Sequence, residues 1–197
     1  MLLSGLDSHP CESIELEQYT TDGDLAARWL TDIAAYGDLA EGYTVADLGA
    51  GNGVLGLGAL AMGAGRAILI EANQAACDVA RSNAESMGLS DSVQVIHATL
   101  GSDPANIGSA DVVISNPPWG RQTPKADRPF LEAMLSSGIP AHLLHSAEAT
   151  HIRPLFEEAG WAVERYGEAD FALPAAYSHH SQRRGRTRAA FWRLIPP

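Results

Sequence analysis

Lysine is almost absent from this chain of 197 residues, because Lys125 is the only one. Cysteine is also scarce: Cys11 and Cys77 form no C-x-x-C spacing, so we expect neither a zinc site nor a disulfide framework. No apolar run approaches the roughly 18 residues that a membrane-spanning helix needs, and no basic segment followed by a long apolar stretch opens the chain. These absences favour a soluble cytoplasmic protein without a bound metal.

The residues that are present suffice for one hydrophobic core. The chain is 46% hydrophobic with a mean hydropathy of -0.06. A chain of this length buries its apolar surface in one core more readily than in two. We therefore expect residues 1–197 to form a single domain.

The charge is strongly negative and unevenly distributed. A net charge of -11 and a pI of about 4.9 disfavour nucleic-acid binding when taken alone, because phosphate contacts need Lys and Arg. An acidic body with almost no lysine is typical of proteins from salt-loving microbes and indicates a halophilic source. The end of the chain nevertheless concentrates arginine, which forms either a local RNA-binding patch or a solvated charged tail: Arg183, Arg184, Arg186, Arg188 and Arg193.

Short apolar runs alternate with helical periodicity along the chain, which is typical of a parallel sheet in an α/β domain. Two strand-like runs at the end, 162–172 and 188–195, leave no room for a full helix between them. We therefore expect a mostly parallel seven-stranded sheet with a C-terminal antiparallel hairpin at its edge. The sequence predicts a capped helix after Thr21-Asp22, strands at 44–48, 67–71, 93–97, 111–115 and 141–145, and helices at 54–62, 74–87, 130–137 and 147–159.

A glycine-rich turn, Asp47-Leu48-Gly49-Ala50-Gly51-Asn52-Gly53, follows the first of these strands. Such a turn places backbone N–H groups and a helix N-terminus against a ligand, and its glycines permit positive φ and close approach. A dinucleotide-binding turn would read G-x-G-x-x-G. Asp47 suits a cofactor with a cationic amino group and would repel a pyrophosphate. The turn therefore favours S-adenosylmethionine, although a purely structural strand-to-helix turn remains the alternative.

An acidic residue also ends the next predicted strand. Glu71 is placed to accept both hydroxyl groups of a ribose, as acidic strand ends do in dinucleotide-binding sheets. The alternative is a solvated loop carboxylate.

The tetrapeptide Asn116-Pro117-Pro118-Trp119 follows the fourth predicted strand. Its prolines stiffen the backbone and leave carbonyl groups that accept hydrogen bonds. An exocyclic amino group is planar and weakly nucleophilic, and hydrogen bonds to the Asn116 side-chain oxygen and the Pro117 carbonyl would favour a pyramidal nitrogen that attacks a methyl sulfonium. Trp119 offers a face on which a base can stack. The alternative is a proline-rich turn with a packed tryptophan.

Five separated motifs together resemble the methyltransferase-like protein five family, adenine-N6 methyltransferases of small-subunit ribosomal RNA that include archaeal members. The resemblance covers roughly Leu16 to the C-terminus. The motifs are Leu16-Glu17-Gln18-Tyr19-Thr20-Thr21, Asn116-Pro117-Pro118-Trp119-Gly120, Asp127-x-x-Phe130-Leu131, Leu143-Leu144-His145 and Leu173-Pro174-Ala175-Ala176-Tyr177-x-x-His180.

The resemblance implies a class I Rossmann-like methyltransferase fold, S-adenosylmethionine as cofactor and S-adenosylhomocysteine as product. Asn116, Pro117, Pro118 and Trp119 are the implied catalytic residues. The implied cofactor-binding residues are Gln18, Tyr19, Thr21, Asp47, Gly49, Ala50, Gly51, Gly53, Leu55, Glu71, Ala72, Thr99 and Asn116. The implied RNA-binding residues are His180, Arg183, Arg184, Arg186 and Arg188.

Some positions depart from the pattern of the family. Thr99 stands where many relatives carry an aspartate for the cofactor's adenine, which would weaken binding unless Asp103 takes over. Glu71 replaces an aspartate, and Trp119 replaces the commoner phenylalanine while keeping a stacking face.

Two other functions stay open. Glutamine methylation of a translation release factor uses the same Asn-Pro-Pro corner, but its family typically has Tyr after the prolines and lacks the Leu16–Thr21 signature. A second alternative is an inactive rRNA-binding or assembly module.

The resemblance also implies a heterodimer with a small zinc-ribbon activator subunit that adds a strand near 67–70. The sparse charge of that segment indicates a surface that is either buried or covered by a partner.

Overall fold

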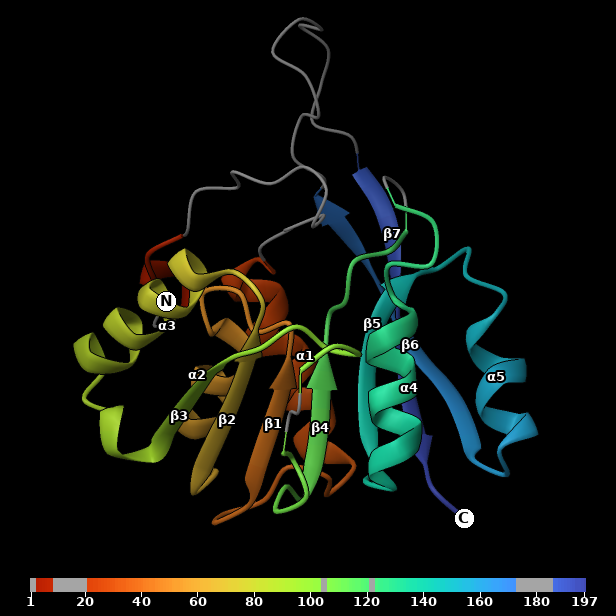
Figure 1. The fold of residues 1–197 in the computed structure, drawn as a ribbon, viewed down its shortest axis with the longest axis horizontal. Coiled ribbons are helices and arrows are strands. Elements are labelled where there is room, and N and C mark those ends of the chain that lie inside the picture. The colour runs from red at the N-terminus through yellow and green to blue at the C-terminus, as the bar shows by residue number, and fades with distance from the viewer. Residues whose placement is uncertain (1–2, 9–20, 104–105, 121–122, 173–185) are drawn as a thin grey trace, which may run out of the picture.

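The computed structural model describes residues 3–8, 21–103, 106–120, 123–172 and 186–197. Its strands form one sheet in the order β3-β2-β1-β4-β5-β7-β6 (Figure 1). Strands β1 to β5 run parallel, and β7 lies antiparallel between β5 and β6, which confirms the predicted fold class. The strands are β1 (Thr44–Leu48), β2 (Arg66–Glu71), β3 (Val93–His97), β4 (Val112–Ser115), β5 (Ala141–Ser146), β6 (Ala162–Ala172) and β7 (Arg186–Ile195).

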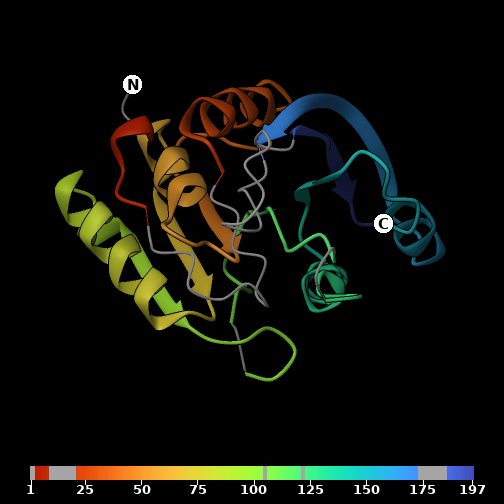
Figure 2. The ribbon, with the colours of Figure 1, turned by 90° about the horizontal axis from the view of Figure 1, so that it is seen from above.

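Helices cover both faces of the sheet. Helices α1, α2 and α3 pack in one hydrophobic core, and α4 and α5 pack in a second core on the other face (Figure 2). Asp22 caps α1, because its side chain accepts hydrogen bonds from the backbone N–H groups of Asp24 and Leu25. The helices are α1 (Gly23–Ala35), α2 (Val54–Ala61), α3 (Gln74–Ser86), α4 (Arg128–Ser137) and α5 (Ile152–Glu158), with 3-10 turns at Leu3–Gly5 and Ser90–Ser92.

The predicted start of the last helix at residue 147 is wrong, since α5 begins at Ile152. The hydroxyl of Ser146 accepts a hydrogen bond from the N–H of Glu148, and the N–H of Ala149 returns to the carbonyl of Ser146. These bonds hold a turn at the end of β5 that competes with the helix.

The apolar strand β2 is buried rather than covered by a partner. It pairs with β1 on one side and β3 on the other, so no further strand can add to it. Strand addition at 67–70 is therefore wrong, and within the described sheet the open edges belong to β3 and β6.

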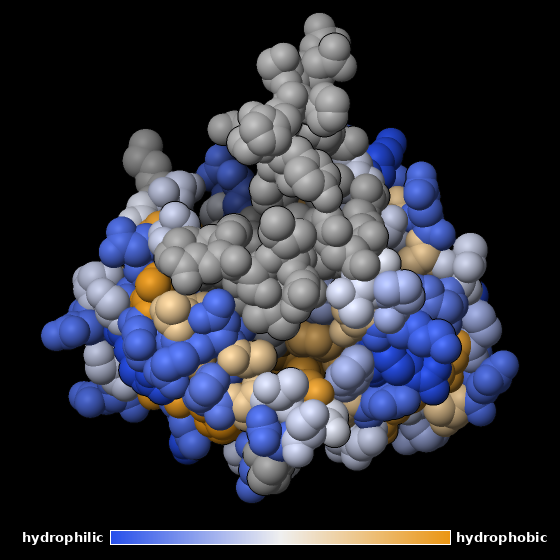
Figure 3. Space-filling view, turned by 45° about the horizontal axis from the view of Figure 1, so that its top comes forward, coloured by the Kyte–Doolittle hydropathy of each residue, from blue (hydrophilic) through white to orange (hydrophobic). Residues whose placement is uncertain are grey.

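The described surface is mainly hydrophilic, with small apolar patches on the face that Figure 3 shows. Among the described residues, the large hydrophobic side chains that are exposed are Tyr36 and Met62. No helix in the described ranges is long and apolar enough to cross a membrane.

Candidate active site at the carboxyl ends of the central strands

The predicted site segments meet where the strand order reverses. Strand β1 lies between β2 and β4, and the crevice at such a reversal is where open α/β sheets bind ligands. Leu48 and Ser115 are partners in register, and the Ser115 hydroxyl donates to the Leu48 carbonyl at 2.7 Å. The glycine turn and Asn116 therefore start side by side from one edge of the sheet.

The glycine turn needs its glycines for backbone reasons. Gly49, Gly51 and Gly53 have φ values of 74°, 54° and 84°, which side chains disfavour. The N–H groups of Gly49 and Ala50 both donate to the carbonyl of Ile70, at 2.8 and 3.0 Å. Ala50 is buried in this turn, and Leu55 is buried in the first turn of α2.

Asp47 is a buried carboxylate, and only one of its two oxygens accepts a hydrogen bond from a described residue. Its side chain is 1% exposed, and Oδ2 accepts the N–H of Gly56 at 3.0 Å, whereas Oδ1 has no hydrogen-bond partner among the described residues. Burial raises the pKa of Asp47 to about 7; the charge of Glu71 adds to the rise, and the bond from Gly56 opposes it. A buried oxygen without a donor is costly, so this arrangement fits a site for a cationic amino group, as S-adenosylmethionine has.

Glu71 supports the glycine turn, a role that the sequence did not predict. Its two oxygens accept the N–H groups of Gly51 and Asn73, at 2.9 and 2.8 Å. Each oxygen keeps a second lone pair for a ribose hydroxyl. The adjacent Ala72 contributes its carbonyl to a 3.0 Å contact with Nε2 of His97.

Thr99 lies two residues beyond the end of β3 and is exposed. Its N–H donates to Oδ2 of Asp103 at 2.8 Å, and the N–H of Asp103 returns to the Thr99 carbonyl. A carboxylate thus lies beside the position where the family's aspartate is missing.

The Asn116 amide is held at both ends. Its Nδ2 donates to Oγ1 of Thr21 at 3.0 Å, and its Oδ1 accepts Nε1 of Trp119 at 3.2 Å. Trp119 is 8% exposed, and its ring packs against His145 and Phe171. Stacking of Trp119 on a target base stays a prediction, and it requires this ring or its neighbours to move.

Several predicted residues lie outside the described residues: Gln18, Tyr19, His180, Arg183 and Arg184. Arg186 begins β7, and Arg188 is exposed and pairs with Glu168 at 2.6 Å. That the predicted RNA-binding residues form one patch stays a prediction.

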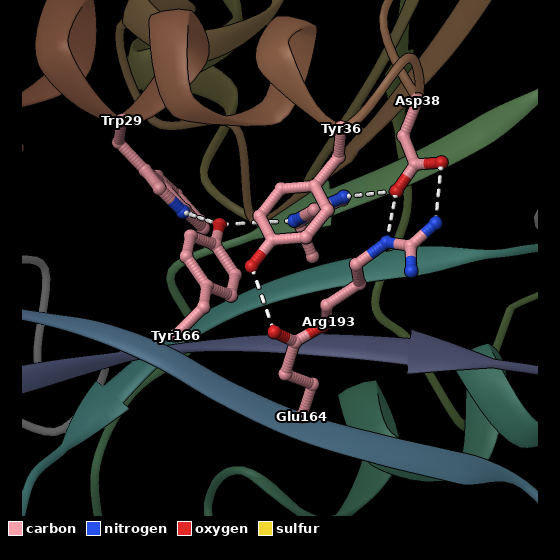
Figure 4. Close-up of polar contacts among 7 residues, drawn as sticks. Trp29, Tyr36, Asp38, Glu164, Tyr166 and Arg193 are labelled. Carbon is pink, nitrogen blue, oxygen red and sulfur yellow. Dashed lines mark hydrogen bonds and ion pairs between the residues drawn. The ribbon is translucent and has the colours of Figure 1, made fainter.

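Arg193 belongs to a separate structural network (Figure 4). Its guanidinium binds both oxygens of Asp38, at 2.5 and 3.0 Å, and lies over the Tyr36 ring. In the same network Tyr36 donates to Glu164, and Nε1 of Trp29 donates to the Tyr166 hydroxyl. These contacts join the end of α1 to the terminal hairpin.

Two asparagines hold the N-terminal segment against the glycine turn, an arrangement that the sequence did not predict. The Asn83 amide bonds the N–H and carbonyl of Asp7, at 3.0 and 3.1 Å, and donates to the carbonyl of Asn52 in the glycine turn. Asn52 also donates to the Asp7 carbonyl. The available signal was a polar residue on the apolar face of α3, between Ala80 and Ala84.

A cavity of about 330 Å³ beside Leu48 does not coincide with this site. It is lined by the segment after β3 and by α4, including Leu100, Ile107 and Ala133, and it contains none of the predicted site residues. The polar contacts at the strand ends define the candidate site.

Comparison with known proteins places these features in a family. Residues 24–146 match the methyltransferase small domain. The chain is 32% identical to the rRNA N(6)-adenosine-methyltransferase METTL5 of Danio rerio, over 98% of this chain and 95% of the relative. It is also 32% identical to an uncharacterized protein of Methanocaldococcus jannaschii, over 93% and 86% of the two chains. A crystal structure of a candidate RNA methyltransferase from Pyrococcus horikoshii superposes with a TM-score of 0.86 at 31% identity, covering 98% of this chain and 94% of that one.

Proposed function

The chain belongs to the methyltransferase small-domain family and within it to the methyltransferase-like protein five group, and from this premise we propose that it methylates adenine N6 in small-subunit ribosomal RNA. The family membership confirms the resemblance that the motifs indicated. The observation that carries the proposal is the Asn116 amide, fixed by Thr21 and Trp119 beside the glycine turn.

The residues of the site fit S-adenosylmethionine. Asp47 offers its amino group a buried oxygen that no described residue bonds, and Glu71 offers lone pairs to its ribose. When bound, this cofactor supplies a methyl group activated by its sulfonium.

Asn116 and Pro117 act on the target nitrogen in this proposal. Oδ1 of Asn116 keeps a second lone pair beside the bond from Trp119, and it accepts one amino hydrogen of adenine while the Pro117 carbonyl accepts the other. These bonds favour a pyramidal nucleophilic nitrogen, so positioning and electrostatics supply the rate without a strong general base.

Methyl transfer to defined substrates tests this proposal. We expect labelled methyl groups from S-adenosylmethionine to enter small-subunit rRNA as N6-methyladenosine, and Asn116→Ala to abolish the signal. Large-subunit rRNA and a translation release factor are the comparison substrates. Labelling of the release factor on glutamine instead of RNA would replace the proposal with the protein-methylating alternative.

The zinc-ribbon activator belongs to the proposal as a partner. Because β2 is internal, such a subunit would add its strand at the open edge of β3 or β6. Co-expression is expected to raise solubility and activity, and a fully active monomer would contradict the partnership.

A further inference from the structure

The carboxylate of Asp127 serves two histidines. Asp127 immediately precedes α4 but makes no side-chain capping bond to it. Its Oδ2 instead contacts Nε2 of His145 at 3.1 Å and Nε2 of His151 at 2.6 Å. Asp127 and His145 are buried, whereas His151 is half exposed. Burial would raise the pKa of Asp127, but the bonds from both histidines outweigh it and hold that pKa below its ordinary value.

These three side chains have an arrangement that could bind a metal ion, but a fourth contact opposes it. The N–H of Ser146 donates to Nδ1 of His145 at 2.9 Å, so Nδ1 carries no hydrogen and Nε2 carries it toward Asp127. A metal on Nε2 of a neutral imidazole would put the hydrogen on Nδ1, facing the Ser146 N–H. The cluster is therefore a hydrogen-bonded support.

The support continues into the candidate active site. The His145 ring stacks on Trp119, with centroids 5.9 Å apart and planes inclined by 23°. Nε1 of Trp119 donates to Oδ1 of Asn116, the atom assigned to the target amino group.

We propose that Asp127 and His145 are positioning residues for methyl transfer, in which Asp127 fixes the His145 ring and that ring holds the Trp119 indole that orients the Asn116 amide. This inference rests on the proposed function of Asn116.

Loss of Asp127 leaves the buried Nε2–H of His145 without its acceptor. The His145 imidazole is then free to rotate, and the Trp119 indole loses the ring on which it stacks. A displacement of about 1 Å at the reacting groups costs about 100-fold in rate, so positioning alone gives a large effect.

Five variants test the chain of contacts: Asp127→Ala, Asp127→Asn, His145→Ala, His145→Phe and the control His142→Gln. Asp127→Asn keeps an oxygen acceptor, and His145→Phe keeps a stacked ring without its hydrogen bonds. His142 also lies in β5, is fully buried and bonds a carboxylate, Asp38, at 2.9 Å. Because side chains alternate along a strand, His142 and His145 point to opposite faces.

Three quantities are measured for each variant. The first is kcat on small-subunit rRNA purified from a strain that lacks the gene, and the second is the dissociation constant for S-adenosylmethionine. The third is hydrogen exchange of the Trp119 indole N–H in protein labelled with 15N-tryptophan, assigned with Trp119→Phe. The third measurement requires no RNA.

We expect the alanine variants to bind S-adenosylmethionine within about threefold of the wild type and to lose about 10- to 100-fold in kcat. The Trp119 indole N–H should exchange faster in the alanine variants. Asp127→Asn should retain part of the wild-type kcat and part of the slow Trp119 exchange. If the alanine variants do not fold, Asp127→Asn and His145→Phe are compared with the wild type in their place. His142→Gln should lower the melting temperature without changing kcat or the Trp119 signal.

Wild-type kcat and unchanged Trp119 exchange in folded Asp127 and His145 variants would overturn the inference. Tight binding of Zn²⁺ that depends on Asp127 would also overturn it. A wild type that does not methylate RNA would instead refute the proposed function, and the Trp119 exchange would still decide whether the support exists.

Discussion

Replacing Asp47 with Asn should stabilise the protein without cofactor and weaken cofactor binding. Asn keeps an oxygen that can accept the N–H of Gly56, but it does not ionise. It removes the buried negative charge, whose Oδ1 has no donor within the part of the chain that the structure describes. Fold stability and cofactor affinity therefore change in opposite directions.

The magnitude follows from the pKa of Asp47, which is about 7 in the fold against 3.8 ordinarily. The folded state binds the proton more tightly, so the free energy of unfolding falls as pH rises from about 4 to about 7 and is level above that range. About three pH units correspond to about 4 kcal/mol. The variant should gain up to that amount at pH 8, and the difference should vanish toward pH 4.

Urea unfolding at several pH values measures the change in stability, and calorimetry with S-adenosylmethionine measures the change in cofactor affinity. Loss of a charge-assisted bond predicts an affinity about 10- to 100-fold lower for Asp47→Asn at pH 8. Wild-type affinity should rise with pH through about 7 as Asp47 ionises, and the variant should lack that rise. A variant that is less stable at pH 8 yet binds the cofactor normally would refute the reasoning.

Three further predictions concern methyl transfer, RNA and the hairpin. Asn116→Ala should abolish methyl transfer while cofactor affinity stays within a few-fold of the wild type, because the amide acts on the target nitrogen. A radiolabel assay measures the transfer and calorimetry measures the affinity. Substantial residual turnover would contradict the prediction. Replacing Arg183, Arg184 and Arg186 with Ala should lower RNA affinity and flatten its salt dependence, by a slope of about 0.7 to 0.9 per lost phosphate contact, without changing cofactor binding. Titrations at several salt concentrations check this, and an unchanged slope would remove the basic patch. Arg193→Ala should lower the melting temperature and spare RNA affinity, because that guanidinium binds Asp38; thermal unfolding and RNA titration check both.

The fold was largely predictable because its signals are local. The strands at 44–48 and 93–97 are confirmed to the residue, since both are short runs rich in β-branched and apolar residues. Propensity alone does not predict the start of α5, because a turn held by the hydroxyl and the carbonyl of Ser146 follows β5. The interior place of β2 depends on pairing with β3, which periodicity does not reveal.

The candidate site was predictable where short motifs follow the predicted strands. The glycine turn, Glu71 and Asn116 lie at neighbouring strand ends, as parallel topology requires. The contacts that hold these residues in place were not predicted, because each joins residues distant in sequence, such as Asn83 with Asp7 and His145 with Asp127. The roles of the site residues stay predictions.

Mass spectrometry of ribosomal RNA from a strain that lacks the gene tests the proposed activity most directly. We expect N6-methyladenosine to disappear from one position of the small-subunit rRNA, to return with the wild-type gene, and to stay absent with Asn116→Ala. An unchanged small-subunit rRNA together with loss of methylglutamine from a release factor would contradict the proposed activity.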